Sequence, residues 1–328
     1  MINEDIYFDK NYGKLYEKIE KGNSEIFKMQ TENGVIINQY IKREIPIKIN
    51  NTKYYDIITP YGYGGPYILK CNNKAKLLTE YLEAFGKYCL KNNIVSEFVR
   101  FHPIYKNYLD FKDIYNAKFN RYTLATNIKD YEDPVSSEFS KHCKKTIRQV
   151  LKEGISFRMI EHPTWNDMED FIRIYYLNME RKEADEYYFF DKEYFKNILN
   201  YFKNKIIIAE SIYKGKIIAA GLYFITAGNI HAHLSGTDTQ YLNLSPAYIL
   251  KYGTAKWAKE HGYNFIHYGG GTDTSEDNPL YLFKCKFAVH TKFEFWIGTK
   301  IWNKEIYNQL CDQSGQEQTD FFPAYRKR

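Results

Sequence analysis

The chain has 328 residues, of which 44% are hydrophobic and 26% are charged, and its formal net charge is +6. This length and apolar content predict a packed protein made of one large domain or two of ordinary size. The positive charge suits anionic ligands such as phosphates, but it is far below that of a dedicated nucleic-acid binder.

The five cysteines are scattered and form no C-x-x-C pair. This spacing argues against a zinc site and against a secreted disulfide framework. Residues 1–7 show neither the basic nor the apolar region of a signal peptide, and no apolar run is long enough to span a bilayer. We therefore expect a cytoplasmic protein with reduced thiols, no metal and no transmembrane segment.

In the first half, the residue patterns predict a hairpin, further strands and one long helix. Asn33-Gly34 separates two alternating segments and is a strong hairpin signal. The expected strands are 26–30, 35–41, 54–58, 94–101 and 119–125, and the expected helices are 9–19 and 74–91. A loop at 59–66 is rich in glycine and tyrosine. Its Tyr61 and Tyr63 either contact a ligand or pack inside a buried connector.

In the second half, Pro134 and Gly154 mark the start and end of a predicted helix. The other expected helices are 164–181, 191–203, 245–261 and 302–311, and the expected strands are 155–161, 205–213, 216–226, 230–235, 264–267 and 292–296. One face of the 134–153 helix carries the basic residues Lys141, Lys145, Arg148 and Lys152. Such a stripe either binds phosphates or is a solvated surface.

Residues 263–287 are the stretch around which the chain is organised. A short strand ends in Gly269, Gly270 and Gly271, an acidic loop follows, and a helix begins after Pro279. Glycines let another molecule approach the main chain, and open α/β sheets bind ligands at such strand ends. Lys284 follows one turn into the helix and can reach back toward the loop. The alternative is a flexible turn followed by a surface helix.

The order of elements in the two halves is similar. A hairpin, a strand, a polar loop, a helix and a strand occupy 25–101 and recur in 205–267. Antiparallel strands followed by a strand–helix–strand crossover predict two similar α/β units rather than one doubly wound sheet.

This order, together with several short motifs, resembles the double-domain branch of the GNAT acyltransferase superfamily, which contains the FemABX peptidyltransferases and the BioF2-like acetyltransferases. The motifs are residues 59–66, 145–154, 178–182, 267–271, 282–284 and 322–326. The resemblance implies an α/β (α+β) fold of two GNAT-like units, each a mixed, mostly antiparallel sheet flanked by helices. It places an N-terminal domain at 1–130 and a C-terminal catalytic domain at 131–328.

The family transfers an acyl group to an amine, which requires a proton acceptor and donors for the tetrahedral oxyanion. Lys284 resembles the cation that FemABX enzymes place against the ester-bearing substrate. The other implied substrate-binding residues are Tyr61, Tyr63, Lys145, Arg148, Arg181 and Phe283. Asp273 and His233 are candidate proton acceptors, and the sequence does not choose between them and Glu276, Asp277 or His231. Cofactor contacts are expected at Ser245, Ala247, Gly269, Gly270 and Gly271.

The identity of the donor divides the hypotheses. Ordinary GNAT enzymes bind the coenzyme A pyrophosphate in a glycine-containing loop, but residues 240–247 lack those glycines. The first hypothesis is an N-acyltransferase that uses acetyl-CoA or another acyl-CoA. Its acceptor is an amine of a cell-envelope or polysaccharide precursor, such as a nucleotide-linked sugar or a muropeptide. The second is an aminoacyl-tRNA-dependent peptidyltransferase acting on a peptidoglycan precursor. The third is an inactive binding module. The oligomeric state is not indicated.

Overall fold

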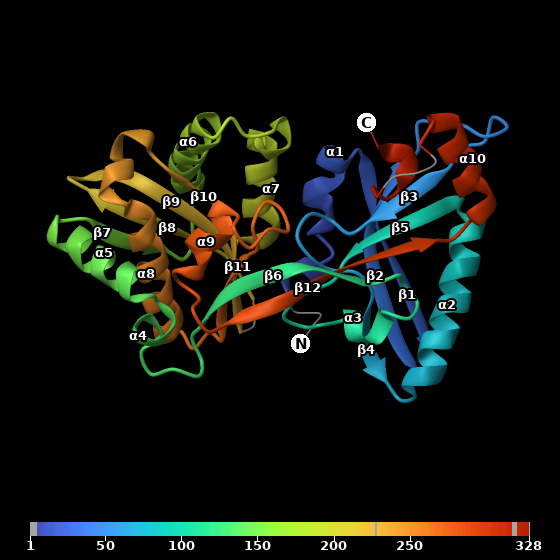
Figure 1. Cartoon of the computed structure of the whole chain (residues 1–328), viewed down its shortest axis with the longest axis horizontal. Coiled ribbons are helices and arrows are strands. Elements are labelled where there is room, and N and C mark those ends of the chain that lie inside the picture. The colour runs from blue at the N-terminus through green and yellow to red at the C-terminus, as the bar shows by residue number, and fades with distance from the viewer. Residues whose placement is uncertain (1–4, 227, 317–319, 328) are drawn as a thin grey trace. The chain divides into compact units, whose positions relative to one another are not determined.

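The computed structural model describes residues 5–226, 228–316 and 320–327, so the start of the N-terminal stretch considered above lies outside the described residues (Figure 1). Contacts divide the chain into two compact units: Met1–Asn120 with Glu294–Arg328, and Arg121–Phe293. Residues 294–328 thus group with the first unit rather than with 131–293, because residues 297–301 pair antiparallel with 96–100.

The first unit is a mixed, mostly antiparallel sheet with helices. Its strands are β1 (Gly22–Thr31), β2 (Gly34–Glu44), β3 (Tyr55–Ile58), β4 (Tyr67–Cys71), β5 (Ile94–Arg100) and most of β12 (Lys292–Ile301). They lie in the order β1-β2-β3-β5-β12, with β4 beside β2, and only β3 and β5 pair in parallel. Its helices are α1 (Glu17–Glu20), α2 (Lys74–Lys91), α3 (Tyr108–Phe111) and α10 (Lys304–Ser314).

The predicted hairpin and long helix are both confirmed. β1 and β2 pair up to Thr31 opposite Gly34, which leaves a two-residue turn. Asn73 caps α2 through the N–H of Lys76, and the helix packs on β1, β2 and β5 (Figure 1). Its buried residues recur every four positions and form the apolar face: Leu77, Tyr81, Phe85 and Cys89.

A carboxylate is enclosed in the core of the first unit. Glu97 is 2% exposed. It accepts hydrogen bonds from Asn38 Nδ2 at 2.8 Å, Tyr115 Oη at 3.0 Å and Trp302 Nε1 at 3.0 Å. Burial raises the pKa of Glu97 to about 7, although the three donors oppose that shift. The network therefore links β2, β5 and the segment after β12 through one titratable group.

The second unit is also a mixed, mostly antiparallel sheet with helices. Its strands are most of β6 (Lys118–Asn127), β7 (Ser156–Ile160), β8 (Ile206–Tyr213), β9 (Lys216–Ile225), β10 (Asn229–Thr237) and β11 (Phe265–Gly269). They lie in the order β6-β11-β10-β9-β8-β7, and only β10 and β11 pair in parallel. Its helices are α4 (Pro134–Glu138), α5 (Lys141–Lys152), α6 (Trp165–Arg181), α7 (Lys192–Phe202), α8 (Pro246–Glu260) and α9 (Pro279–Cys285).

Helices cover both faces of this second sheet. Successive residues of a strand point to opposite faces. Tyr223 of β9 packs in the core cluster formed with α5 and α8, whereas the next residue, Phe224, contacts Phe202 of α7. Phe283 packs against the core cluster on the α5 and α8 side, whereas the candidate base His233 contacts Phe224 and Tyr194 of α7 on the other side.

The predicted single helix 134–153 is wrong. It breaks at Phe139, whose backbone is extended, and Ser140 starts a new helix by capping the N–H of Cys143 at 3.2 Å. A residue distant in sequence stabilises the break, because the Ser140 N–H donates to the Lys286 carbonyl at 2.9 Å. Smaller differences include β4 and α3, which were not predicted, and the helix 9–19, of which only 3-10 turns and the short α1 form.

The predicted internal repeat is confirmed at the level of element order. In the first unit β3 and β5 are parallel and are joined through α2, and in the second β10 and β11 are parallel and are joined through α8. Each parallel pair is preceded by an antiparallel hairpin, β1–β2 or β8–β9. The expected fold class is therefore also confirmed.

Candidate active site

The candidate site lies where two parallel strands of the second unit stop pairing. β10 and β11 pair over three residues each, ending at His231 opposite His267. Just beyond, β10 has a bulge at His233 against β9, and β11 has one at Tyr268 against β6. Within the described residues no further pair joins the two strands. The carboxyl ends of parallel strands are the usual place for a ligand in an open α/β sheet.

The glycines after β11 allow side chains to approach the main chain closely. Gly269 has a φ of +71°, in the left-handed region. A Cβ added at Gly270 would lie 2.9 Å from Arg121 Cδ, and one added at Gly271 would lie 2.8 Å from Asn278 Cγ. Part of the space beside these glycines is thus taken by protein side chains. Their predicted contact with a cofactor stays a prediction.

Two residues hold the loop after Gly271 in place through hydrogen bonds. Arg121 donates from one guanidinium nitrogen to the carbonyl oxygens of Gly271 and Asp273, both at 2.8 Å. Asn278 donates to Asp273 Oδ2 at 2.8 Å, and its own side-chain oxygen caps the first turn of α9. Arg121 was not predicted as a site residue, because nothing in its local sequence distinguishes it from other strand residues.

Lys284 reaches back from α9 to the glycine loop, as the sequence predicts. Its Nζ donates to the Gly270 carbonyl oxygen at 2.6 Å, and the side chain is half-buried. Burial is the main reason that the pKa of Lys284 falls to about 7. The further causes are the positive charges of Lys251, Lys182 and Arg121. A lysine that is desolvated among other cations is typical of a site that receives a negative charge.

Phe283 and the start of α8 adjoin this lysine. Phe283 contacts Tyr248 edge to face, with ring centroids 5.6 Å apart. Ser245, one residue before α8, has a φ of +53° and makes no side-chain cap to the helix. Pro246 follows at the first helical position, and Ala247 is half-buried. The start of a 15-residue helix thus has no side-chain cap, which suits an anion.

The two candidate proton acceptors differ in setting. Asp273 is exposed and accepts hydrogen bonds from the Ser275 N–H and Asn278 Nδ2, which lower its pKa. His233 bonds to Tyr194 Oη at 2.7 Å, and burial lowers the pKa of its imidazole to about 3. At neutral pH the carboxylate of Asp273 and the uncharged imidazole of His233 can each accept a proton, but each would hold the acquired proton weakly. Their catalytic roles stay predictions.

The basic face of α5 is exposed to solvent. Cys143, Ile147 and Val150 turn inward, and the outward positions are Lys141, Lys145, Arg148 and Lys152. In the ranges that the structure covers, no ion pair joins any of these four side chains to a carboxylate. Arg181 is likewise exposed, at the end of α6, and donates to Asn178 Oδ1 at 3.0 Å.

Tyr61 and Tyr63 lie in the first unit, whereas Lys284 belongs to the second. Tyr63 is 9% exposed and contacts the rings of Tyr7 and Phe295, each with centroids 5.2 Å apart. The Tyr61 carbonyl accepts a hydrogen bond from Tyr12 Oη at 2.8 Å. Packing therefore accounts for much of this loop, and substrate binding by the two tyrosines stays a prediction.

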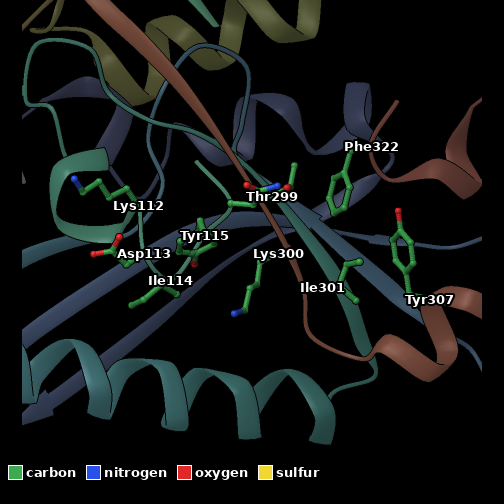
Figure 2. A pocket seen from close by; sticks show the side chains of 10 residues that line it. Lys112, Asp113, Ile114, Tyr115, Thr299, Lys300, Ile301, Tyr307 and Phe322 are labelled. Carbon is green, nitrogen blue, oxygen red and sulfur yellow. The ribbon is translucent and has the colours of Figure 1, made fainter. Parts of the chain in front are cut away.

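A separate hollow of about 630 Å³ lies in the first unit, between β12, the segment after α3 and α10 (Figure 2). It is lined by Lys112, Asp113, Ile114, Tyr115, Asn116, Thr299, Lys300, Ile301, Tyr307 and Phe322. None of the predicted site residues is among them, so this hollow and the glycine loop are different features.

Known proteins share both the domain and the fold. Residues 137–277 match the family model described as an acetyltransferase (GNAT) domain. FemX has 13% identity and a TM-score of 0.68, with 91% of this chain and 92% of that chain covered. The L-PGS structure from Bacillus licheniformis has 14% identity and a TM-score of 0.55, with 90% and 91% covered. A tandem GNAT protein from the clavulanic acid biosynthesis pathway has 8% identity and a TM-score of 0.51, with 86% and 83% covered.

The fold is therefore similar to those of FemX, L-PGS and a tandem GNAT protein. Residues 137–277 thus match a GNAT acetyltransferase domain, and the whole chain has a fold similar to those of FemX and L-PGS, in line with the sequence resemblance. No curated protein matches the sequence. Among the described residues, no helix has both the length and the hydrophobicity needed to cross a bilayer.

Proposed function

We propose that the protein is a cytoplasmic N-acyltransferase that moves an acyl group from an acyl-CoA, such as acetyl-CoA, to an amine of a cell-envelope or polysaccharide precursor. The observation that carries this proposal is the Lys284 ammonium, held 2.6 Å from the Gly270 carbonyl where β10 and β11 stop pairing. The uncapped start of α8 supports a donor that carries a pyrophosphate, because helix N-termini favour anions.

In the proposed reaction, the acceptor nitrogen attacks the thioester carbonyl carbon, and an oxyanion develops on the carbonyl oxygen. An ammonium has three N–H donors, and Lys284 directs one of them to Gly270, which leaves two for the oxyanion. Collapse of the intermediate breaks the C–S bond, and the coenzyme A thiolate leaves while the amide forms. The proton lost by nitrogen passes to a base, for which Asp273 and His233 are the candidates.

A second candidate function is transfer of an amino acid from aminoacyl-tRNA to a peptidoglycan precursor, as the resemblance to the FemABX branch implies. The observation that favours it is the exposed basic face of α5, which carries four cations and lacks ion pairs with carboxylates in the described part of the chain. Such a face can follow an RNA phosphate backbone. The chemistry at Lys284 would be the same, with an ester oxygen in place of the thioester sulfur as leaving group.

Calorimetric titration separates these proposals. The protein is titrated with acetyl-CoA and, separately, with aminoacyl-tRNA carrying a stable amide linkage. Saturable binding of acetyl-CoA supports the first function, and binding of the tRNA alone supports the second. Binding of neither donor contradicts both and leaves the inactive binding module as the explanation of the fold.

A further inference from the structure

A second lysine of the candidate active site is buried without a counter-ion. Lys251, on α8, is 9% exposed. Its Nζ lies 4.5 Å from the centroid of the Tyr268 ring and 5.4 Å from that of the Tyr223 ring. Within the described ranges, it has neither a hydrogen-bond acceptor nor a carboxylate partner. Aromatic faces attract a cation but do not replace the hydration that a buried ammonium loses.

One of these two rings carries a buried hydroxyl that also lacks a partner. Tyr223 is 1% exposed, and its Oη has no hydrogen-bond partner among the described residues. The neighbouring Tyr268 hydroxyl is satisfied, because it bonds to Thr126 Oγ1 at 2.6 Å. Gly221 leaves room for the Tyr223 ring, since a Cβ there would lie 3.1 Å from Tyr223 Oη. The orphan hydroxyl is therefore held in a defined position on β9.

The chemistry of these two groups limits what can satisfy them. A lysine ammonium donates only, and a phenol hydroxyl beside a cation will also donate. A partner for both must therefore be an acceptor, and the positive charge of Lys251 favours an anion. One carboxylate supplies two acceptor oxygens and one negative charge, which match the two donor groups and the single positive charge of Lys251. A phosphate would bring further oxygens, and these would need further donors.

We propose that Lys251 and Tyr223 form a binding subsite for one carboxylate group of a substrate. The positive charge of Lys251 also lowers the pKa of Lys284, so the subsite lies within electrostatic reach of that lysine. The site itself does not depend on the proposed acyl transfer, but the source of the carboxylate rests on that function. It belongs either to the acyl chain of the donor or to the acceptor amine.

The site is tested without catalysis, by thermal unfolding with sodium propionate against sodium chloride at equal ionic strength. We expect propionate to raise the Tm of the wild type by about 2 °C at saturating concentration. Lys251→Met should abolish the rise, and Tyr223→Phe should reduce it without removing a ring. Lys256→Met is the matched control, because Lys256 is an exposed residue of the same helix. No rise in the wild type, an equal rise in Lys251→Met, or a rise with phosphate but not with propionate would overturn the proposal.

The source of the carboxylate is resolved by two titrations. Succinyl-CoA is compared with acetyl-CoA, and alanine with alaninamide. If the carboxylate is on the acyl chain, succinyl-CoA binds about tenfold more tightly than acetyl-CoA, and Lys251→Met removes the difference. If it is on the acceptor, alanine binds and alaninamide does not. Absence of both differences overturns the assignment of the subsite to a substrate, whereas failure of acyl transfer alone leaves the thermal result intact.

Discussion

Lys284 Nζ donates a hydrogen bond to the carbonyl oxygen of Gly270, 2.6 Å away and fourteen positions earlier in the chain. This bond joins the helix α9 to the loop that follows β11. It holds the ammonium of a half-buried lysine at a carbonyl rather than at a carboxylate, so the positive charge is oriented but not neutralised. Such a charge is available to a substrate.

Replacement of this ammonium should slow the reaction without preventing binding. We expect Lys284→Ala to lower kcat by about ten- to a thousandfold with a small change in KM, because an oxyanion contact acts only in the transition state. Steady-state kinetics with the acyl donor identified by calorimetry would measure this. Lys286→Ala is the control, since Lys286 lies two residues further and bonds to Tyr248 Oη. Equal rates for Lys284→Ala and wild type would reject the role.

The same lysine should govern the pH profile. The pKa of Lys284 is lowered to about 7, and the ammonium is its active form. Activity should therefore fall as the pH rises through about 7, unless substrate binding raises that pKa. In Lys284→Arg the falling limb should move to higher pH, because a guanidinium stays charged. The measurement compares the pH profiles of kcat/KM for the two proteins. If the falling limb stays at the same pH in Lys284→Arg, another group is responsible for it.

The buried charge of Lys284 should also reduce stability. Its folded-state pKa lies below the unfolded value, so the unfolded chain binds more protons between about pH 7 and 10.5. The destabilisation is complete below pH 7 and fades as the pH rises to 10.5. We expect Lys284→Met to be more stable than wild type by about 1 to 3 kcal/mol at pH 6, and equally stable near pH 10. Urea unfolding at the two pH values measures the difference, and a constant difference would contradict the assignment.

The buried carboxyl of Glu97 should have the opposite effect, so that the free energy of unfolding falls as the pH rises. Its folded-state pKa is raised to about 7, so the stability that is present below pH 4.5 is lost progressively as the pH rises through 7. We expect Glu97→Gln to lack this loss and to gain about 1 to 3 kcal/mol relative to wild type between pH 5 and 8. Denaturant unfolding across that range checks the slope. Parallel curves for both proteins would show that Glu97 is not the titrating group.

The basic face of α5 should matter only if a tRNA is the donor. We expect the double variant Lys145→Glu, Arg148→Glu to weaken tRNA binding and to reduce the slope of log K against log salt by about 1 to 2, while acetyl-CoA binding is unchanged. Binding is measured at 50 and 200 mM salt. Lys87→Glu, Lys91→Glu on α2 is the matched control, because both residues are exposed on one helix. Equal losses in the two double variants would indicate a nonspecific charge effect.

Local signals predicted much of the fold. α2 has the bounds predicted for it, and the hairpin turn, Glu32-Asn33, directly precedes Gly34, because both features depend on periodicity and turn chemistry within the segment. The break at Ser140 could not be predicted in the same way. A serine after five helical residues reads as part of the helix, and the bond from its N–H to the Lys286 carbonyl depends on tertiary structure.

The candidate site was predicted in part. The motif that contains Phe283 and Lys284 and the three glycines pointed to the lysine and the loop that it contacts. Arg121 and Tyr223 come from distant strands, so their place beside that loop or beside Lys251 appears only in the folded chain. Lys251 had one local signal, since it is a charged residue among the buried positions Ile249, Leu250 and Thr254 of α8.

The grouping of residues 294–328 with the first unit bears on synthesis at the ribosome. The second unit is one uninterrupted segment, 121–293, whereas the first is encoded in two pieces on either side of it. A growing chain can thus complete the inserted segment while the edge of β5 still awaits β12. A vector that ends at residue 120 would yield an unfinished sheet with a bare edge, which is prone to aggregate. Expression of the first unit alone calls for a short linker that joins 120 to 294.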